Sequence, residues 1–218
     1  MYAVKTLFDL EHTLAGDYLS RFQYPHEALE GIGDFILALG ASLPSAYQEQ
    51  RPGVWIHTDA AVAPTAEIIG PCIIGPNSEI RQCAYIRGSV LIGEKCVVGN
   101  STEIKNAILF DGVQVPHFNY IGDSILGYRA HFGAGVITSN VRGDKDLVVI
   151  HTAGELPTGR KKVGAFVGDF AEVGCNAVLN PGSVLGRNTQ VYPTACVRGV
   201  VPENYIWRLN GTIVPRKA

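Results

Sequence analysis

The sequence has little charge, few cysteines and no long hydrophobic run. Only 17% of its 218 residues are charged, and 18 basic residues against 20 acidic ones give a formal net charge of −2. Because there is no run of basic residues, nucleic acid is a poor candidate partner. The longest apolar runs fall far short of the ~20 residues that a membrane-spanning helix needs. The N-terminal residues lack the pattern of a secretory signal, so we expect a cytoplasmic protein without a membrane segment.

The five cysteines predict neither a disulfide framework nor a zinc site. Their number is odd, and no two of them have C-x-x-C spacing. No pair of histidines has the spacing of a metal site either, so we expect no metal. The glycine motifs of P-loop, Rossmann and hydrolase folds are missing as well. By contrast, 25 glycines and 12 prolines with a single methionine indicate many turns rather than long helices.

Aliphatic β-branched residues recur at every sixth position over much of the chain. From Ile56 to Ile104, nine successive positions six apart carry Ile or Val; the series resumes after one-residue slips at Leu109 and Leu126, and runs again from Val167. A period of six fits neither a helix nor a simple strand, so each of these residues is expected to point inward from one short strand. Three strands then close a triangular coil of 18 residues. The predicted fold is a parallel β-solenoid of roughly seven coils, stacked about 4.8 Å apart.

Two segments lie outside this repeat. Residues 1–52 contain apolar residues at helical spacing, which predicts a short helical segment that we interpret as a hairpin capping the end of the solenoid. Residues 139–164 are polar and interrupt the repeat, and because long loops often carry function they form the candidate active-site arm. We therefore divide the chain into an N-terminal helical segment (1–52), a β-helix domain (53–200) with the insertion 139–164, and a C-terminal tail (201–218).

Two cations are predicted to lie side by side on adjacent coils. Arg87 and Lys105 each follow an inward-pointing isoleucine and are 18 residues apart, so their backbones are expected about 5 Å from each other. At that separation their repulsion is ~3 kcal/mol at an effective dielectric constant of 20, a cost that a phosphate or carboxylate between them would offset. The alternative is that both side chains point into solvent or pair with Glu103 or Asp123.

A histidine and its polar neighbours form a second candidate group. His117 and Tyr120 lie in one stretch, and His131 and Asn140 follow about one and two coils later, so we expect these side chains to share one face. A neutral imidazole can take a proton from an attacking amine, which makes His117 the candidate base. A lone histidine on a solenoid is more often an ordinary surface residue, and His131 could equally be structural. The glycines of residues 133–135 would let a ligand approach the backbone closely, although Gly133 also fills an ordinary turn position.

Several stretches of the chain resemble one family of enzymes. Residues 86–145, with the blocks G-N-x-x-E-x-K-N and H-x-x-Y-x-G-D, resemble the C-terminal acetyltransferase domain of the bifunctional glucosamine-1-phosphate acetyltransferase / N-acetylglucosamine-1-phosphate uridyltransferase. The later TGRKKVGAFVGDFAEVGCNAVLNPG is similar to the archaeal sugar-1-phosphate nucleotidylyltransferase/acetyltransferases. The resemblance covers about residues 54–200. It implies a left-handed β-helix, whereas general crossover rules would favour the right hand.

Carried over position by position, the resemblance implies a functional site on this chain. It implies that His117 is the catalytic base and that acetyl-CoA is the acetyl donor. The implied substrate contacts are Arg87, Lys105, Tyr120, His131, Asn140 and Lys145. The implied coenzyme contacts are Ala134, Gly135, Asp169 and Pro193. It also implies a homotrimer with its sites between subunits, and no uridyl transfer, because the nucleotidyltransferase half is missing.

We therefore expect a hexapeptide-repeat N-acetyltransferase that moves acetyl from acetyl-CoA to the amine of an amino-sugar 1-phosphate. Backbone N–H groups near residues 133–135 are candidates to bind the thioester oxygen. Direct attack is expected because no cysteine occupies a nucleophile position in this set, and Cys96 is predicted to point inward. The rival hypothesis is a non-catalytic β-helix scaffold that binds a sugar nucleotide or a partner subunit. O-acetyl transfer by the same histidine is a third, and the identity of the amino sugar stays open.

Overall fold

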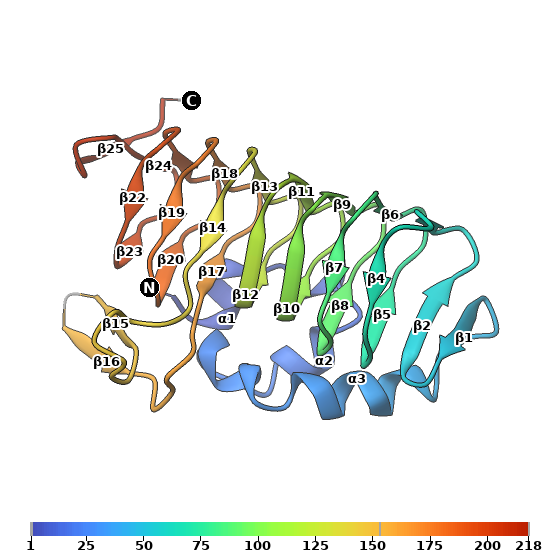
Figure 1. Cartoon of the computed structure of the whole chain (residues 1–218). Helices are drawn as coiled ribbons and strands as arrows, with labels where there is room; N and C mark the ends of the chain where they lie inside the picture. Colours follow the sequence, from blue (N-terminus) through green and yellow to red (C-terminus); the bar gives the residue numbers. More distant parts are fainter. Residues whose placement is uncertain (1, 153, 218) are drawn as a thin grey trace.

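Short parallel strands wind into a solenoid of triangular coils, shown in the computed structural model in Figure 1. The structure describes residues 2–152 and 154–217. We name the three sides of the triangle face 1, face 2 and face 3, in the order in which the chain passes through them, and each corner by the two faces that it joins.

Each face is a ladder of parallel strands. Face 1 consists of β2 (Val54–His57), β5 (Cys72–Ile74), β8 (Val90–Ile92), β17 (Ala165–Val167), β20 (Ser183–Leu185) and β23 (Val200–Val201). Face 2 consists of β3 (Ala61–Val62), β6 (Glu79–Ile80), β9 (Val97–Asn100), β11 (Gln114–His117), β13 (His131–Phe132), β18 (Glu172–Val173), β21 (Gln190–Val191) and β24 (Tyr205–Trp207). Face 3 consists of β4 (Glu67–Ile68), β7 (Tyr85–Ile86), β14 (Ile137–Thr138), β19 (Val178–Leu179) and β22 (Cys196–Val197). Two longer strands, β10 (Glu103–Leu109) and β12 (Tyr120–Leu126), cross corner 3–1 and belong to both faces.

The strand register follows the period of six. Ile56 pairs with Ile74 and Ile74 with Ile92 on face 1. The complete inward row of face 1 is Ile56, Ile74, Ile92, Leu109, Leu126, Val167, Leu185 and Val201. These eight stacked positions define a solenoid of about eight coils. The predicted fold class, a left-handed parallel β-helix with a short N-terminal helical segment, is confirmed.

The one-residue slips in the repeat are shortened corners. From Ile92 to Leu109, and from there to Leu126, the chain advances 17 residues per coil instead of 18. The residue is lost at corner 3–1, where β10 and β12 turn without a loop and Asn106 and Asp123 adopt φ values of 46° and 48°. Asn and Asp tolerate this left-handed region better than most residues because their short side chains hydrogen-bond locally. The shortened corners are therefore made by residue types suited to them.

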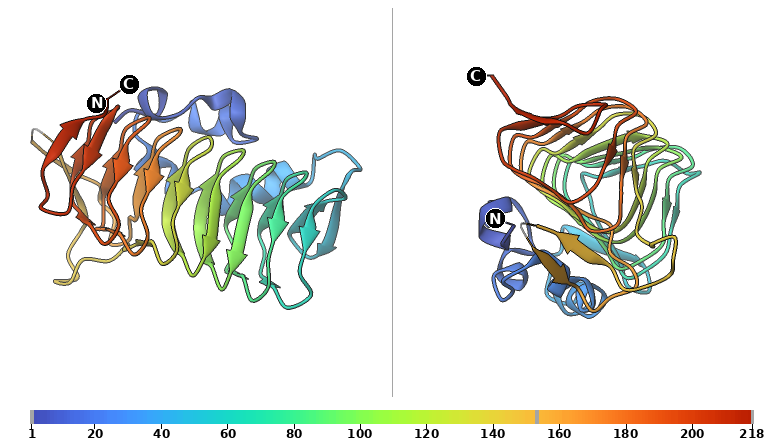
Figure 2. Two further views of the ribbon diagram at one scale, coloured as in Figure 1. Left: turned by 90° about the horizontal axis from the view of Figure 1, so that it is seen from above. Right: turned by 90° about the vertical axis from the view of Figure 1, so that its left-hand side faces the viewer.

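The N-terminal segment lies along the solenoid and not at its end. Its helices are α1 (Val4–Leu7), η1 (Leu10–His12), α2 (Gly16–Leu19), η2 (Pro25–Leu29) and α3 (Ile32–Gly40). Helix α3 contacts β5, β8 and β10, and η2 contacts β12. Figures 1 and 2 show the helices running along one side of the coils. The predicted hairpin that caps the end is therefore wrong.

The composition of face 1 explains why a cover is needed there. The residue before each inward position points outward by the strand alternation, and on the central coils of this face it is apolar and fully buried. These residues are Ile73, Leu91, Ile108, Ile125, Phe166 and Val184. The insertion 139–164 completes the cover, since its antiparallel hairpin of β15 (Val149–His151) and β16 (Glu155–Pro157) packs against β20. Seen along the axis in Figure 2, the helices and this hairpin lie on the same side of the triangle.

Antiparallel strands close both ends of the solenoid. At the first coil, β1 (Tyr47–Arg51) pairs with β2. At the last coil, β25 (Ile213–Pro215) pairs with β24, so strand pairing continues past residue 200 into the segment expected as a tail. Among the described residues, no helix has the length and apolar character that crossing a bilayer requires.

Candidate functional site

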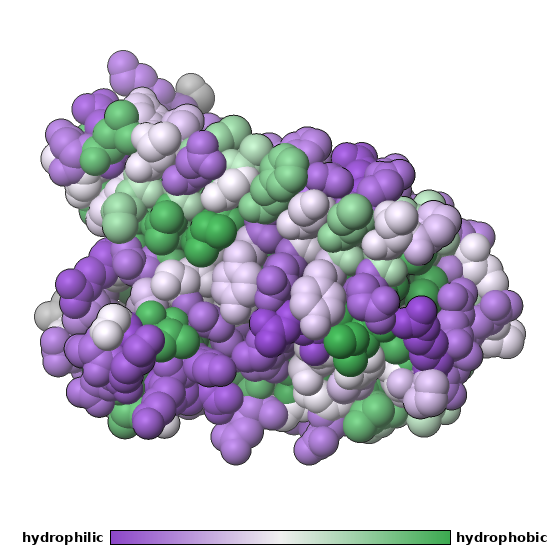
Figure 3. Space-filling view, viewed as in Figure 1, coloured by the Kyte–Doolittle hydropathy of each residue, from purple (hydrophilic) through white to green (hydrophobic). Residues whose placement is uncertain are grey.

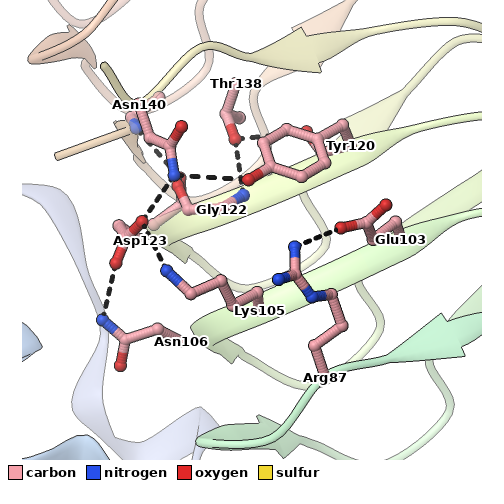
Figure 4. A network of polar contacts seen from close by, with 11 residues as sticks. Arg87, Glu103, Lys105, Asn106, Tyr120, Gly122, Asp123, Thr138 and Asn140 are labelled. Carbon is pink, nitrogen blue, oxygen red and sulfur yellow. Dashed lines mark hydrogen bonds and ion pairs between the residues drawn. The ribbon is translucent and has the colours of Figure 1, made fainter. Parts of the chain in front are cut away.

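A buried carboxylate organises corner 3–1 in the middle of the solenoid. The side chain of Asp123 is only 5% exposed and accepts hydrogen bonds from the amides of Asn106 (2.9 Å) and Asn140 (2.5 Å). Asn106 donates to Oδ1 and Asn140 to Oδ2, and Oδ2 also lies 3.4 Å from Nζ of Lys105. The amide of Asn140 also donates to the Tyr120 hydroxyl at 3.3 Å. We call these five residues the Asp123 network; Figure 4 shows them converging from β10, β12 and the start of the arm.

The local sequence explains why these side chains meet. Lys105 and Gly122 are paired across β10 and β12, so the residue after each of them turns the same corner on neighbouring coils. Tyr120 points outward from face 3 one position before an inward isoleucine, and Asn140 begins the arm at the same corner. Burial raises the pKa of the Tyr120 phenol, and the hydrogen bond from Asn140 opposes that shift. Tyr120 is therefore a neutral hydroxyl at physiological pH.

Arg87 and Lys105 lie next to each other as predicted, and each has its own carboxylate. The N–H of Arg87 donates to the carbonyl of Ile104, which places the two cations in adjacent coils. Arg87 Nη1 lies 2.7 Å from Glu103 Oε1, and Lys105 pairs with Asp123. The alternative considered from the sequence, pairing with Glu103 and Asp123, is thus confirmed. The repulsion between the cations is offset within the chain, so it does not by itself require a bound anion.

His117 ends β11 at corner 2–3, and its ring is exposed. The hydrogen bonds of this residue involve its backbone: its N–H donates to Asn119 Oδ1 at 3.2 Å and its carbonyl accepts from the N–H of Gly135 at 3.0 Å. Within the described residues no side chain hydrogen-bonds to the imidazole. Tyr120 follows three residues later around the corner. The base candidate thus lies at the start of face 3 with its ring exposed, and the Asp123 network lies at the other end of that face.

The glycine-rich turn of residues 133–135 stacks on His117 at the same corner. Gly135 has φ +75°, a conformation that residues with a side chain rarely adopt, so the backbone of this turn favours glycine. The N–H groups of Gly133 and Gly135 are bonded to neighbouring coils. Among the described residues the N–H of Ala134 has no such partner. Of the backbone groups considered for the thioester oxygen, Ala134 N–H is the one left free.

Cys175 and Pro193 occupy the same corner on the next two coils. The N–H of Asn176 donates to the carbonyl of Ala134, and the N–H of Thr194 donates to the carbonyl of Cys175. The thiol of Cys175 is exposed, so a cysteine does lie at this corner, about 10 Å from His117 at two coil spacings. Sequence reasoning missed Cys175 at this corner. The available signal was its position, since Cys175 follows a glycine just as Ala134 does one coil earlier. Cys96 is buried and inward as predicted.

Two predicted residues, His131 and Lys145, lie away from both the Asp123 network and corner 2–3. His131 begins β13 on face 2, where Nδ1 lies 2.7 Å from Glu172 Oε2. It precedes an inward phenylalanine on face 2, whereas Tyr120 precedes an inward isoleucine on face 3, so the predicted shared face is wrong for His131. Lys145 lies exposed on the arm with φ 62°, and its N–H donates to the carbonyl of Arg142. It makes no contact with the Asp123 network among the described residues.

Asp169 binds the N-terminal segment at corner 1–2. Its carboxylate is 1% exposed, accepts the N–H groups of Asp9 and Tyr128 at 2.8 Å each, and lies 3.3 Å from Arg187 Nη2. Burial raises the pKa of Asp169, while the two N–H groups and Arg187 oppose the shift. The structure therefore places Asp169 in a buried structural contact, one corner away from Ala134 and Gly135.

Comparison with known proteins finds a matching family model and several similar sequences. The family model described as the GMPPB C-terminal domain matches residues 68–153. A bifunctional sugar-1-phosphate nucleotidylyltransferase/acetyltransferase of Sulfurisphaera tokodaii is 36% identical over 124 residues, which are 56% of this chain and 29% of the relative. The bifunctional protein GlmU of Methanococcus maripaludis is 32% identical over 135 residues, or 62% of this chain and 33% of the relative. This chain is thus similar in sequence to part of these bifunctional proteins. The predicted resemblance is confirmed.

This chain spans about a third of the length of the curated relatives it matches, 29% and 33% for the two above. Among solved structures, the acetyltransferase domain of PglB from Neisseria gonorrhoeae is 18% identical with a TM-score of 0.41, covering 75% of this chain and 57% of that one. UDP-N-acetylglucosamine O-acyltransferase of Moraxella catarrhalis is 17% identical with a TM-score of 0.42, covering 76% and 73%. At these values neither likeness decides anything about the chemistry of this chain.

Proposed function

We propose that this protein is an acetyltransferase that moves an acetyl group from acetyl-CoA to the amine of an amino-sugar 1-phosphate. The observation that supports this most is the exposed imidazole of His117, which among the described residues has no side-chain partner and lies three residues before Tyr120, whose hydroxyl joins the Asp123 network across face 3. An exposed base at one end of a face whose other end carries hydroxyl-binding groups suits a sugar amine that must lose a proton as it attacks. The similarity to bifunctional nucleotidylyltransferase/acetyltransferases agrees with this chemistry.

In the proposed reaction His117 takes a proton from the acceptor amine while the nitrogen attacks the thioester carbonyl. The C–N bond forms, the C–S bond breaks, and the thiolate of coenzyme A leaves and takes up the proton from the imidazolium. The N–H of Ala134 is the candidate donor to the oxygen that gains charge, since its neighbours in the turn are already bonded. Acetyl-CoA supplies the activated acetyl group; the chain supplies the base, the donor and the orientation.

We propose that Arg87 and Lys105 bind the acceptor phosphate without giving up their carboxylates. Only one terminal nitrogen of Arg87 contacts Glu103, so most of the five guanidinium donors are left for a ligand. Lys105 has three donors and uses one at 3.4 Å. Tyr120 and Asn140 would orient the sugar. Lys145 lies on the arm and would reach the acceptor only from another position or from a neighbouring subunit of the proposed homotrimer.

The test is thiol release from acetyl-CoA with a panel of amino sugars and their 1-phosphates. Wild type and His117→Ala are compared, with His57→Ala in the first coil as the matched control histidine. We expect release with a phosphorylated amine, a loss of about 10² to 10⁴ in turnover for His117→Ala, and no loss for His57→Ala. Full activity of His117→Ala would overturn the assignment of the base. Silence across the panel without coenzyme binding would favour a non-catalytic scaffold.

A further inference from the structure

A cavity of about 680 Å³ lies at the far end of corner 3–1, between the arm and the last coils. The solenoid side contributes Ser139, Asn180 and Arg198, which take equivalent positions on three successive coils. The arm contributes Arg142 and His151. We call these five residues the arm pocket. It is independent of the Asp123 network, which includes none of them.

The charges in the arm pocket leave one cation without a counterion. Arg142 contacts both oxygens of Asp144, at 3.0 Å and 2.5 Å, and this contact lowers the pKa of Asp144 to about 2. That pair is thus ionised and neutral in sum at physiological pH. Arg198 makes no ion pair in the described part of the chain, and its Nη2 lies 3.0 Å from Nε2 of His151. A neutral imidazole accepts that hydrogen bond but does not compensate the charge.

This arrangement differs from that of the other cations at the same corner. Arg87 and Lys105 each have a carboxylate within 2.7 and 3.4 Å. Arg198 instead lines a cavity in which the other charged lining residues, Arg142 and Asp144, pair with each other, and Ser139 is also in the lining. The nearest carboxylate to His151, that of Glu155, lies 3.8 Å from Nδ1, the ring nitrogen that does not contact Arg198. A guanidinium with a planar set of donors, next to a hydroxyl and a second arginine, is the donor arrangement that binds phosphate oxygens.

Face 3 carries an apolar pair beside the corner that joins the arm pocket to the Asp123 network. Ile137 and Val178 are half-buried, point outward from β14 and β19, and pair across these strands. Figure 3 shows hydrophobic residues over β14 and β19 beside the polar arm. Lys105 and Arg198 are four coils apart on this corner, or about 19 Å at 4.8 Å per coil, so a single phosphate cannot contact both. A ligand that reaches both sites must be elongated, with an apolar or neutral middle.

We propose that the arm pocket is a second anion site, and that Arg198, His151 and Arg142 there bind a diphosphate group of a ligand lying along face 3. The diphosphate can come from either of two sources, the acyl-carrying coenzyme or a nucleoside diphosphate attached to the acceptor sugar. The choice between these sources rests on the proposed function; the site itself rests on its charges and geometry.

The experiment measures binding by calorimetry with pyrophosphate, coenzyme A and uridine diphosphate as probes. The variant is Arg198→Gln, and Arg51→Gln is the matched control, because Arg51 is an exposed arginine at the opposite end of the solenoid that pairs with Glu67 at 3.1 Å. Arg87→Gln reports binding at the other cation pair separately. We expect Arg198→Gln to weaken pyrophosphate binding about tenfold or more, since a charge-assisted contact is lost. Arg51→Gln is expected to bind pyrophosphate as wild type does. Arg198→Gln and Arg51→Gln are both expected to have the melting temperature of the wild type.

Each outcome decides a different point. A loss for coenzyme A alone assigns the site to the coenzyme, and a loss for uridine diphosphate alone assigns it to the acceptor. If Arg198→Gln binds all three probes as wild type does, the arm pocket is not an anion site, whether or not coenzyme A binds elsewhere. If wild type binds pyrophosphate through Arg198 but never binds coenzyme A, the second site stands and the proposed acetyl transfer fails.

Discussion

Replacing Asp123 by Asn tests whether one carboxylate holds the centre of the candidate site. The substitution keeps size and suits the local φ of 48°, so the backbone is undisturbed. It removes the negative charge that faces Lys105, whose side chain is 26% exposed. It also replaces one of the two acceptor oxygens by an NH2 group, which would face the donors that this oxygen now accepts from. A hydrogen bond to a charged group contributes ~1.5–3 kcal/mol, and a buried group left unpaired costs about as much. We expect a loss of about 2–4 kcal/mol in the free energy of unfolding.

The assay is thermal unfolding followed by circular dichroism. For a chain of this length a loss of that size lowers the melting temperature by about 5–15 °C. Asp59→Asn is the matched control, since that carboxylate is 64% exposed and its melting temperature is expected to stay that of wild type. A double variant with Lys105→Met is expected to cost less than the sum of the two single changes, because they remove the same ion pair. An Asp123→Asn protein that melts with wild type would refute the claim that this carboxylate organises the corner.

Three other changes test separate parts of the structure. Gly99→Ala places a Cβ 1.5 Å from a carbonyl oxygen of the next coil, so we expect loss of folded protein in expression and circular dichroism. Asp169→Asn is expected to speed hydrogen exchange in the N-terminal segment that its carboxylate holds. Burial raises the pKa of Asp169 in the folded protein. The free energy of unfolding therefore falls as pH rises from about 3.9, the pKa in the unfolded chain, through the raised pKa of the folded protein. The Asn variant should lack this pH dependence of the melting temperature. Glu103→Gln frees an exposed Arg87 and is expected to leave melting unchanged while lowering the KM for a phosphorylated acceptor.

The solenoid was predictable because its core repeats one constraint. Every inward position must hold an aliphatic side chain that stacks on its equivalent, so Ile56, Ile74 and Ile92 already define the register that the structure shows. The slips in the repeat were visible too, but their meaning was not. The sequence alone did not show that the missing residue lies at corner 3–1, where Asp123 then becomes buried and collects three donors.

The position of the N-terminal helices depended on a pattern that the period of six hides. The repeat of six identifies the inward positions. The residues that show that face 1 must be covered are outward ones such as Ile73 and Leu91. A row of apolar residues on the outer side of face 1 was the available signal. Asp169 was misplaced for a related reason, since its partner Asp9 lies 160 residues away and no local pattern links the two.

The site was predictable where neighbouring residues stay together in the fold. His117 and Tyr120 are three residues apart and remain at one corner, and Arg87 and Lys105 are one coil apart and remain adjacent. His131 was placed by counting coils without assigning the face, so it was assigned to the wrong side of the triangle.

The most direct test of the account is analysis of the acceptor after incubation with acetyl-CoA. Mass spectrometry and nuclear magnetic resonance of the product are expected to show one acetyl group on the amine nitrogen of a phosphorylated amino sugar. The product should form with wild type and His57→Ala and be lost with His117→Ala. An acetyl group on a hydroxyl would keep the site and change the acceptor atom, whereas no acetylated product from any amino sugar, with no binding of the coenzyme, would contradict the account.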